Sequence, residues 1–429
     1  PDFRELINPR PMDVAEVQAT LGEGEVLLFT LSGTWETYIW AISRDRADWH
    51  AVFFPDPDDM KGRVTALRRL LSSTENARAA EAMSDEGDSF PAIRAFDRGL
   101  AHGIYGDLLA PLAHVFDGAE HLLLVPDGPL TSLPFGLLIA SEPQGADDDP
   151  FALRDTDWLI KRHALTVLPN VSSLRALRRD EAEAPVDRRP FVGFGDPIFA
   201  YGRDDLGPTG IVADGDYVTR GAFEELSEVA NLAQLPGTRR ELRRLALLTG
   251  ADMERDLFLG EAATESAVRA ADLEDVEILA FATHGLLAGE LSGLAEPALV
   301  FTPPGEPGEA DDALLTASEA AGLRLSADLI ILSACNTAAS DGTPGSDGLS
   351  GLARSFIYAG AQSILVSHWP VDDRATVALT TGMVGQMAEG TSRAAALRTA
   401  MLALMEDDAD PRYAHPRFWA PFILVGEGA

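Results

Sequence analysis

The run Val276-Glu-Ile-Leu-Ala-Phe-Ala-Thr-His284-Gly285 decides the fold class of this 429-residue chain. Its aliphatic and β-branched residues predict a buried strand of a parallel sheet. A second run of the same kind, Asp328-Leu-Ile-Ile-Leu-Ser-Ala-Cys335, ends on the only cysteine of the chain. Open α/β sheets carry their sites at the carboxyl ends of the strands. We therefore expect an imidazole and a thiol at neighbouring strand ends.

A thiol beside an imidazole is the minimum for a cysteine nucleophile with its own base. Taken singly, a lone cysteine is most often a small buried hydrophobe, and a lone histidine is usually a surface or core residue. The two residues together favour a catalytic role, because each is followed by a residue that suits a tight turn after the strand, Gly285 and Asn336. Two other histidines compete as the base. His102 lies in a helical pattern, and His368 follows a third strand end but lacks a following glycine, so His284 is preferred.

Composition limits the class of protein. With 46% apolar residues the chain is globular, and it is too long for one ordinary core, so two α/β subdomains are expected. The net charge of −34 argues against direct binding of nucleic acid. We expect no membrane segment, no metal site and no cofactor, since no apolar run spans a bilayer and His and Cys residues are scattered. One cysteine fits a reducing compartment, so a cytoplasmic location is expected.

Strand and helix patterns alternate in the second half of the chain. The expected strands are 253–258, 276–283, 298–302, 328–334, 362–367 and 421–425. The expected helices are 238–248, 263–271, 316–322, 348–359, 373–388 and 392–405. This alternation predicts a mainly parallel, six-stranded sheet with helices on both faces. The first half is expected to hold a meander of three strands over 24–54, helical segments at 61–83 and 90–116, and strands at 121–125, 163–168 and 191–194.

Several short motifs follow one another in a fixed order. They are Ala282-Thr-His284-Gly285, Leu332-Ser-Ala-Cys335-Asn-Thr337, Gly348-Leu-Ser-Gly-Leu-Ala-Arg354, Ser367-His-Trp369-Pro-Val-Asp372 and Phe418-Trp-Ala-Pro-Phe422. Together they resemble the CHAT family of bacterial caspase-like domains, which are usually fused to tetratricopeptide repeats and share a clan with caspases, separases and gingipains. The resemblance covers roughly residues 15–427. One departure is His368, where the family more often has leucine.

The resemblance implies an α/β, caspase-like three-layer sandwich in residues 231–429. A second, degenerate and non-catalytic caspase-like half would precede it in residues 15–230, and residues 1–14 would be a linker remnant from an upstream region. The implied activity is that of a cysteine endopeptidase, with Cys335 as the nucleophile and His284 as the general base and acid. Backbone N–H groups of Gly285 and Cys335 are the implied oxyanion donors.

The resemblance also implies that a protein substrate lies as an extended strand beside the third strand end. The side chains expected next to it are Ser367, His368 and Trp369. Acidic residues near that end would favour a basic side chain before the scissile bond, and they are Asp347, Asp372 and Asp373. Alternatively, Asp373 only caps the helix that begins there.

A catalytically latent or silent protein-binding module that needs an activator is the second hypothesis. The intact pair of His284 and Cys335 favours the enzyme. The expected partners are upstream tetratricopeptide repeats, an activating partner and one substrate protein, in a regulated bacterial defence or signalling system.

Overall fold

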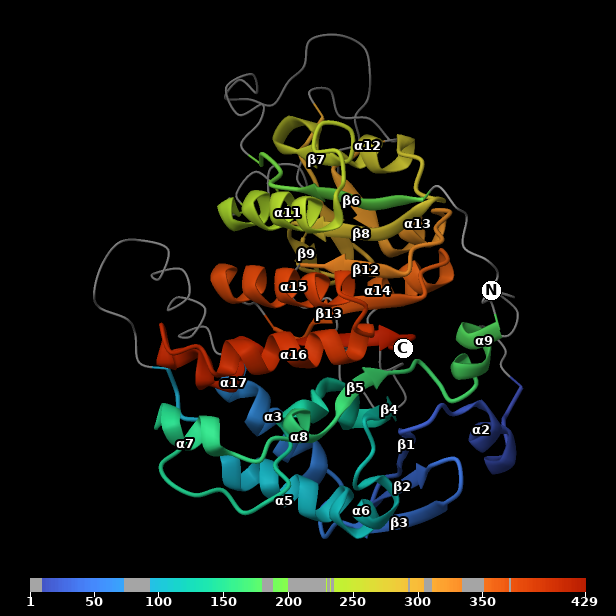
Figure 1. Cartoon of the computed structure of the whole chain (residues 1–429), viewed down its shortest axis with the longest axis vertical. Helices are drawn as coiled ribbons and strands as arrows, with labels where there is room; N and C mark the ends of the chain where they lie inside the picture. The colour runs from blue at the N-terminus through green and yellow to red at the C-terminus, as the bar shows by residue number, and fades with distance from the viewer. Residues whose placement is uncertain are drawn as a thin grey trace. The chain divides into compact units, whose positions relative to one another are not determined.

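A computed structural model describes residues 10–72, 93–179, 188–199, 229, 232, 235–291, 294–304, 311–333, 351–369 and 372–429 (Figure 1). The chain divides into two compact units. The first unit contains the described residues up to 179 together with 365–429, and the second contains those of 188–333 and 351–364. Packing thus groups the C-terminal segment with the start of the chain, whereas the sequence-based division falls near residue 230.

The first unit holds a mixed sheet in the order β3-β2-β1-β4-β5-β14. Its strands are β1 (Glu25–Ser32), β2 (Glu36–Ile42), β3 (Ala47–Phe53), β4 (His121–Val125), β5 (Ala164–Val167) and β14 (Phe422–Gly426). Strands β1 to β3 form an antiparallel meander, and β4, β5 and β14 continue from β1 in parallel. Strand β13 (Ser363–Ser367) neighbours β14 and is divided between the units after residue 364.

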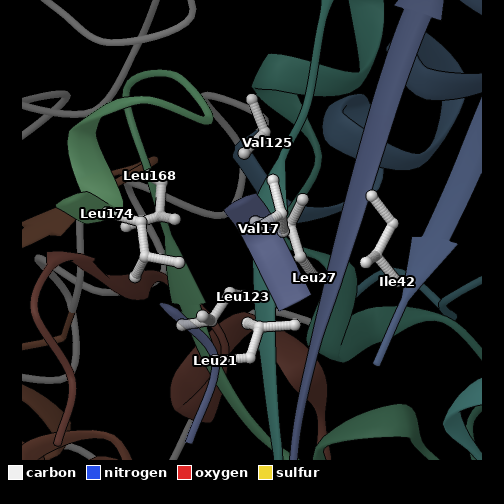
Figure 2. Packing of buried hydrophobic residues seen from close by; sticks show 8 residues of the cluster. All are labelled: Val17, Leu21, Leu27, Ile42, Leu123, Val125, Leu168 and Leu174. Carbon is white, nitrogen blue, oxygen red and sulfur yellow. The ribbon is translucent and has the colours of Figure 1, made fainter. Parts of the chain in front are cut away.

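The described part of the first unit also contains α-helices. They are α2 (Val14–Thr20), α3 (Asp59–Ser72), α5 (Arg98–Leu108), α6 (Ala113–Phe116), α7 (Pro150–Asp155), α8 (Leu159–Arg162), α9 (Ser173–Arg179), α15 (Asp373–Ala388), α16 (Arg393–Met405) and α17 (Pro416–Trp419). Figure 2 shows one core cluster, in which Val17 of α2 and Leu21, its C-cap, pack with Leu27 and Ile42 of the meander. A capping box between Asp13 and the first turn starts α2.

The second unit holds a parallel sheet in the order β12-β8-β6-β7. Its strands are β6 (Arg189–Gly195), β7 (Leu257–Leu259), β8 (Val276–Ala282) and β12 (Leu329–Leu332). The helices are α11 (Pro236–Thr249), α12 (Glu265–Ala270), α13 (Ala317–Ala321) and α14 (Gly351–Tyr358). A small antiparallel sheet contains β9 (Gly285–Leu286), β10 (Ala298–Val300) and β11 (Leu314–Thr316). Strands β8 and β12 are almost continuously buried, as strands covered on both faces are.

The α/β class and the mostly parallel sheet are confirmed, but two expected elements are wrong in detail. The strand expected at 298–302 is β10, which belongs to the small antiparallel sheet, and β6 takes the place beside β8 instead. The helix expected at 90–116 is interrupted at Pro111, which has no backbone N–H to continue the helical ladder. Within the described ranges, no helix is long and apolar enough to cross a membrane.

Candidate active site

His284 lies directly beyond β8 and immediately before Gly285, the first residue of β9. Its backbone carbonyl accepts a hydrogen bond from the Val300 N–H at 3.0 Å, which ties the residue to β10. The imidazole is half-buried, and its ring centroid lies 5.3 Å from that of Phe199. The fold therefore holds His284 at the carboxyl end of β8, where sites of parallel sheets form.

Strand β12 reaches the same end of the sheet as β8. The two strands are parallel, and Leu332 lies opposite Phe281. The Ser333 N–H extends this ladder with a hydrogen bond of 2.9 Å to the Phe281 carbonyl. His284 is the third residue after Phe281, and Cys335 is the third residue after Leu332. Cys335 itself lies outside the described residues, as does Asp347.

A buried carboxylate, which the sequence did not indicate as a site residue, contacts the carboxyl end of β12. The Ser333 hydroxyl donates to Glu241 Oε1 at 2.6 Å, and Glu241 is only 2% exposed on α11. Burying a carboxylate is costly unless donors converge on it. The signal in the sequence is an acidic residue inside an apolar stripe, since Leu242 and Leu245 share the buried side of α11. This contact fixes the strand end that leads toward the cysteine.

The turn after β6 supplies the ring that lies against His284. Asp196 follows the strand with a left-handed φ of 53°, which is uncommon for residues other than glycine. Its N–H donates to Thr238 Oγ1 at 3.1 Å, and its carboxylate accepts from Arg239 Nε at 2.5 Å. These contacts secure the turn that carries the buried Phe199. Among the described residues, no three His, Cys, Asp or Glu side chains are grouped so that they could hold a metal ion.

The residues expected beside a substrate strand are buried in the first unit. Ser367, His368 and Trp369 are each at most 1% exposed. Trp369 Nε1 donates to the Arg417 carbonyl at 3.0 Å, and the His368 N–H donates to the Pro421 carbonyl at 2.9 Å. All three side chains are core residues here, and their contact with substrate stays a prediction.

The capping role considered for Asp373 belongs to its neighbour. Asp372 is the N-cap of α15, and its carboxylate accepts from the N–H groups of Arg374 and Ala375 at 3.0 and 2.9 Å. Asp372 is 7% exposed, while Asp373 is an exposed residue of the first turn. The carboxylate of Asp372 is thus occupied by the helix terminus.

Comparison with known proteins decides the family. The model of the CHAT domain matches residues 98–427. The chain belongs to the CHAT family. Tetratricopeptide repeat protein 28 of Mus musculus is 32% identical over 199 residues, which are 39% of this chain and 8% of that protein. The CHAT chain therefore spans less than a tenth of the length of this mammalian relative.

Two solved structures are similar at low identity. The Arg-specific cysteine proteinase gingipain R has 10% identity, covers 77% of this chain and 66% of its own, and gives a TM-score of 0.40. The separase of the Saccharomyces cerevisiae separase–securin complex has 10% identity, covers 96% of this chain and 30% of its own, and gives a TM-score of 0.47. At these scores neither likeness bears on the activity of this CHAT chain.

The burial of His368 has a physical consequence. Burial lowers the pKa of His368 to about 3, and the positive charge of Arg68 acts in the same direction. Arg68 also donates to the His368 carbonyl at 3.1 Å. Among the described residues, His368 Nδ1 has no hydrogen-bond partner. The imidazole is therefore neutral at physiological pH and leaves a buried polar atom unsatisfied.

We expect His368→Leu to make the chain more resistant to acid. Between pH 6.5 and about 3 the unfolded imidazole binds a proton that the folded one does not, so the wild type loses stability as the pH falls through this window. At pH 4 this loss amounts to roughly 3 kcal/mol. Urea unfolding at pH 7 and pH 4 measures it. The exposed His114→Leu is the control, and equal pH dependence of both variants and the wild type would contradict the expectation.

Proposed function

We propose that this CHAT domain is a cysteine endopeptidase that cleaves a specific protein, with Cys335 as the nucleophile and His284 as the general base and acid. The register of β8 and β12 supports this proposal. Phe281 and Leu332 lie opposite each other, and the third residue after each of them is His284 and Cys335, respectively. Neighbouring strands are about 4.8 Å apart. The two strands that precede these residues therefore end side by side at one edge of one sheet.

The proposed reaction is an acyl transfer to sulfur. His284 accepts the proton of the Cys335 thiol, and the thiolate attacks the carbonyl carbon of the scissile bond. The imidazolium then returns the proton to the leaving amine, and water hydrolyses the thioester.

Backbone donors are proposed to stabilise the tetrahedral oxyanion, and each is worth roughly 3 kcal/mol. Gly285 suits this role by its strand pairing. Gly285 lies opposite Leu299 of β10. In the neighbouring pair, the Val300 N–H donates a hydrogen bond to the His284 carbonyl. Pairs alternate along an antiparallel ladder, so the Gly285 N–H is directed away from β10. A glycine also lets a substrate approach the backbone closely.

Covalent capture tests this proposal. A peptide with an electrophilic acyloxymethyl ketone should add once to the wild-type chain, much faster than to a free thiol such as glutathione, and intact-mass analysis follows the rate. His284→Ala should slow labelling strongly, whereas His102→Ala, a histidine of α5 that also precedes a glycine, should not. Labelling at the rate of a free thiol, unchanged by His284→Ala, would show that the two residues do not work together.

The finer proposal is a preference for a basic residue before the scissile bond. Asp347 and Asp373 are the acidic candidates that remain once Asp372 is taken as the cap of α15. Asp373→Asn or Asp347→Asn should reduce the preference for Arg over Ala by about tenfold, whereas Asp58→Asn, an exposed change far along the chain, should not. A peptide-library profile measures this. A wild-type profile dominated by acidic or aliphatic residues would refute the preference.

The partners also remain proposals. The name of the mammalian relative supports an arrangement in which the CHAT domain acts beside tetratricopeptide repeats in a longer protein. Cleavage would then be controlled by an activating partner in a defence or signalling system. A latent or silent binding module is the alternative, and a wild-type Cys335 that reacts no faster than a free thiol would favour it.

A further inference from the structure

The β1–β3 meander of the first unit has two contrasting faces. Its inner face belongs to the core, since Thr37, Ile39 and Ala41 alternate along β2 and are at most 2% exposed. An antiparallel sheet that buries one face ordinarily turns polar side chains outward on the other. The outer face of this meander departs from that rule.

The outer face is aromatic. Phe29 lies opposite Trp40, and Trp40 lies opposite Trp49, so the three rings form a row across three strands. The ring centroids of Phe29 and Trp40 are 5.2 Å apart, and Tyr38 lies 6.0 Å from Trp40 and 6.3 Å from Trp49. At β3, the outermost strand, Trp49 is 57% and Phe53 72% exposed. An exposed aromatic cluster of this kind marks an interaction surface.

This surface is called the aromatic face below. It consists of Phe29, Leu31, Tyr38, Trp40, Trp49 and Phe53. All six side chains come from one face of β1, β2 and β3, because their register pairs are separated by even numbers of residues along each strand.

A helix already covers the adjoining part of the same face. Val17 of α2 and Leu21, its C-cap, pack with Leu27 and Ile42 (Figure 2). Phe29 is partly buried against this cluster. The cluster also includes Leu123 and Val125 of β4, and α2 lies against β2 as well. Helix α2 has only seven residues and covers the part of the face formed by Leu27 and Ile42. Tyr38, Trp49 and Phe53 do not belong to this cluster.

The length of the strands and the charge of the chain define this helix further. Strands β2 and β3 have seven residues each, or about 23 Å, which equals about 15 residues of helix. The only charged outer-face position in β2 and β3 is Glu36, beside Phe53. The chain as a whole carries a charge of −34, so it repels a second copy of itself and attracts a cationic partner.

We propose that the aromatic face is a docking surface for an amphipathic helix with basic flanks, which lies beside α2 over β2 and β3. The apolar stripe of the helix would cover Tyr38, Trp49 and Phe53, and its Lys or Arg residues would lie at the end of the face that carries Glu36. This helix-in-groove type of recognition does not depend on protease activity.

A designed peptide tests the proposal on the whole chain. The probe is a fluorescein-labelled peptide of about 15 residues, with leucines at helical spacing and lysines elsewhere. A scrambled peptide of the same composition has no apolar stripe. Fluorescence anisotropy should show saturable binding of the first peptide only. Trp49→Ala and Phe53→Ser should each weaken it at least about tenfold, because exposed aromatic residues dominate such contacts.

The matched control is Phe151→Ser, which removes a side chain that is 68% exposed elsewhere in the first unit. It should leave the affinity within about twofold, and circular dichroism should show all variants folded. Three results would overturn the proposal: no binding, equal binding of the scrambled peptide, or full affinity in both variants of the aromatic face. Sedimentation that reveals a Trp49-dependent dimer, unaffected by the peptide, would assign the face to a second copy instead.

Discussion

Cys335→Ala should lower peptide hydrolysis at least about 10³-fold, and His284→Ala about 10²- to 10⁴-fold. In the proposed mechanism the thiolate is the attacking atom, so its loss would remove the covalent route and leave only the oxyanion donors. The imidazole would be needed twice, first as base and then as acid toward the leaving amine. Steady-state rates with the best peptide from a library measure both effects.

The competing histidines provide the controls for this prediction. His368→Leu should keep its activity at pH 7, because the buried imidazole is neutral there and belongs to the core of the first unit. His102→Ala should also keep it, since His102 lies on α5 and its Nδ1 contacts the Ile139 carbonyl. If His368→Leu lowered the rate as far as His284→Ala does, the base would have been assigned to the wrong strand end.

Regular elements were predictable wherever one local signal was strong. The run over 276–283 is β8, and the pattern over 373–388 is α15 with the same bounds. Both depend on periodicity within the segment, which the sequence displays directly. His284 and Cys335 were singled out for the same reason, because each closes a buried apolar run.

Pairing partners and burial were not predictable in this way. Strand β10 has three residues, and its partner β9 has two, so no periodicity reveals that they form a separate sheet. Burial of Trp369 depends on Arg417, which is remote in sequence. The buried Glu241 likewise accepts a hydrogen bond from Ser333, which is 92 residues further along the chain. Local patterns define elements, whereas contacts between distant segments decide which polar groups are buried.

Arg98→Ala should destabilise the first unit by roughly 3 kcal/mol, because buried acceptors lose a donor. Arg98 begins α5 and is 1% exposed, and its guanidinium donates five hydrogen bonds. The acceptors are Asp147 Oδ1, Thr156 Oγ1 and the carbonyls of Gln144, Gly145 and Ala152. Alanine would remove these five hydrogen bonds, and Arg98→Lys, with three donors on one nitrogen, would restore only part of the loss.

Tryptophan fluorescence in urea measures this loss for the first unit alone, because all six tryptophans, including the buried Trp158 and Trp419, belong to it. Arg162→Ala is the control. Its side chain is 38% exposed and pairs with Asp157, so its removal should cost only about 0–1 kcal/mol. Each variant removes one arginine that is paired with one aspartate, so the difference between them reports the burial of Arg98 together with its four further hydrogen bonds. Equal midpoints would mean that the Arg98 network only orders its loop without stabilising the unit.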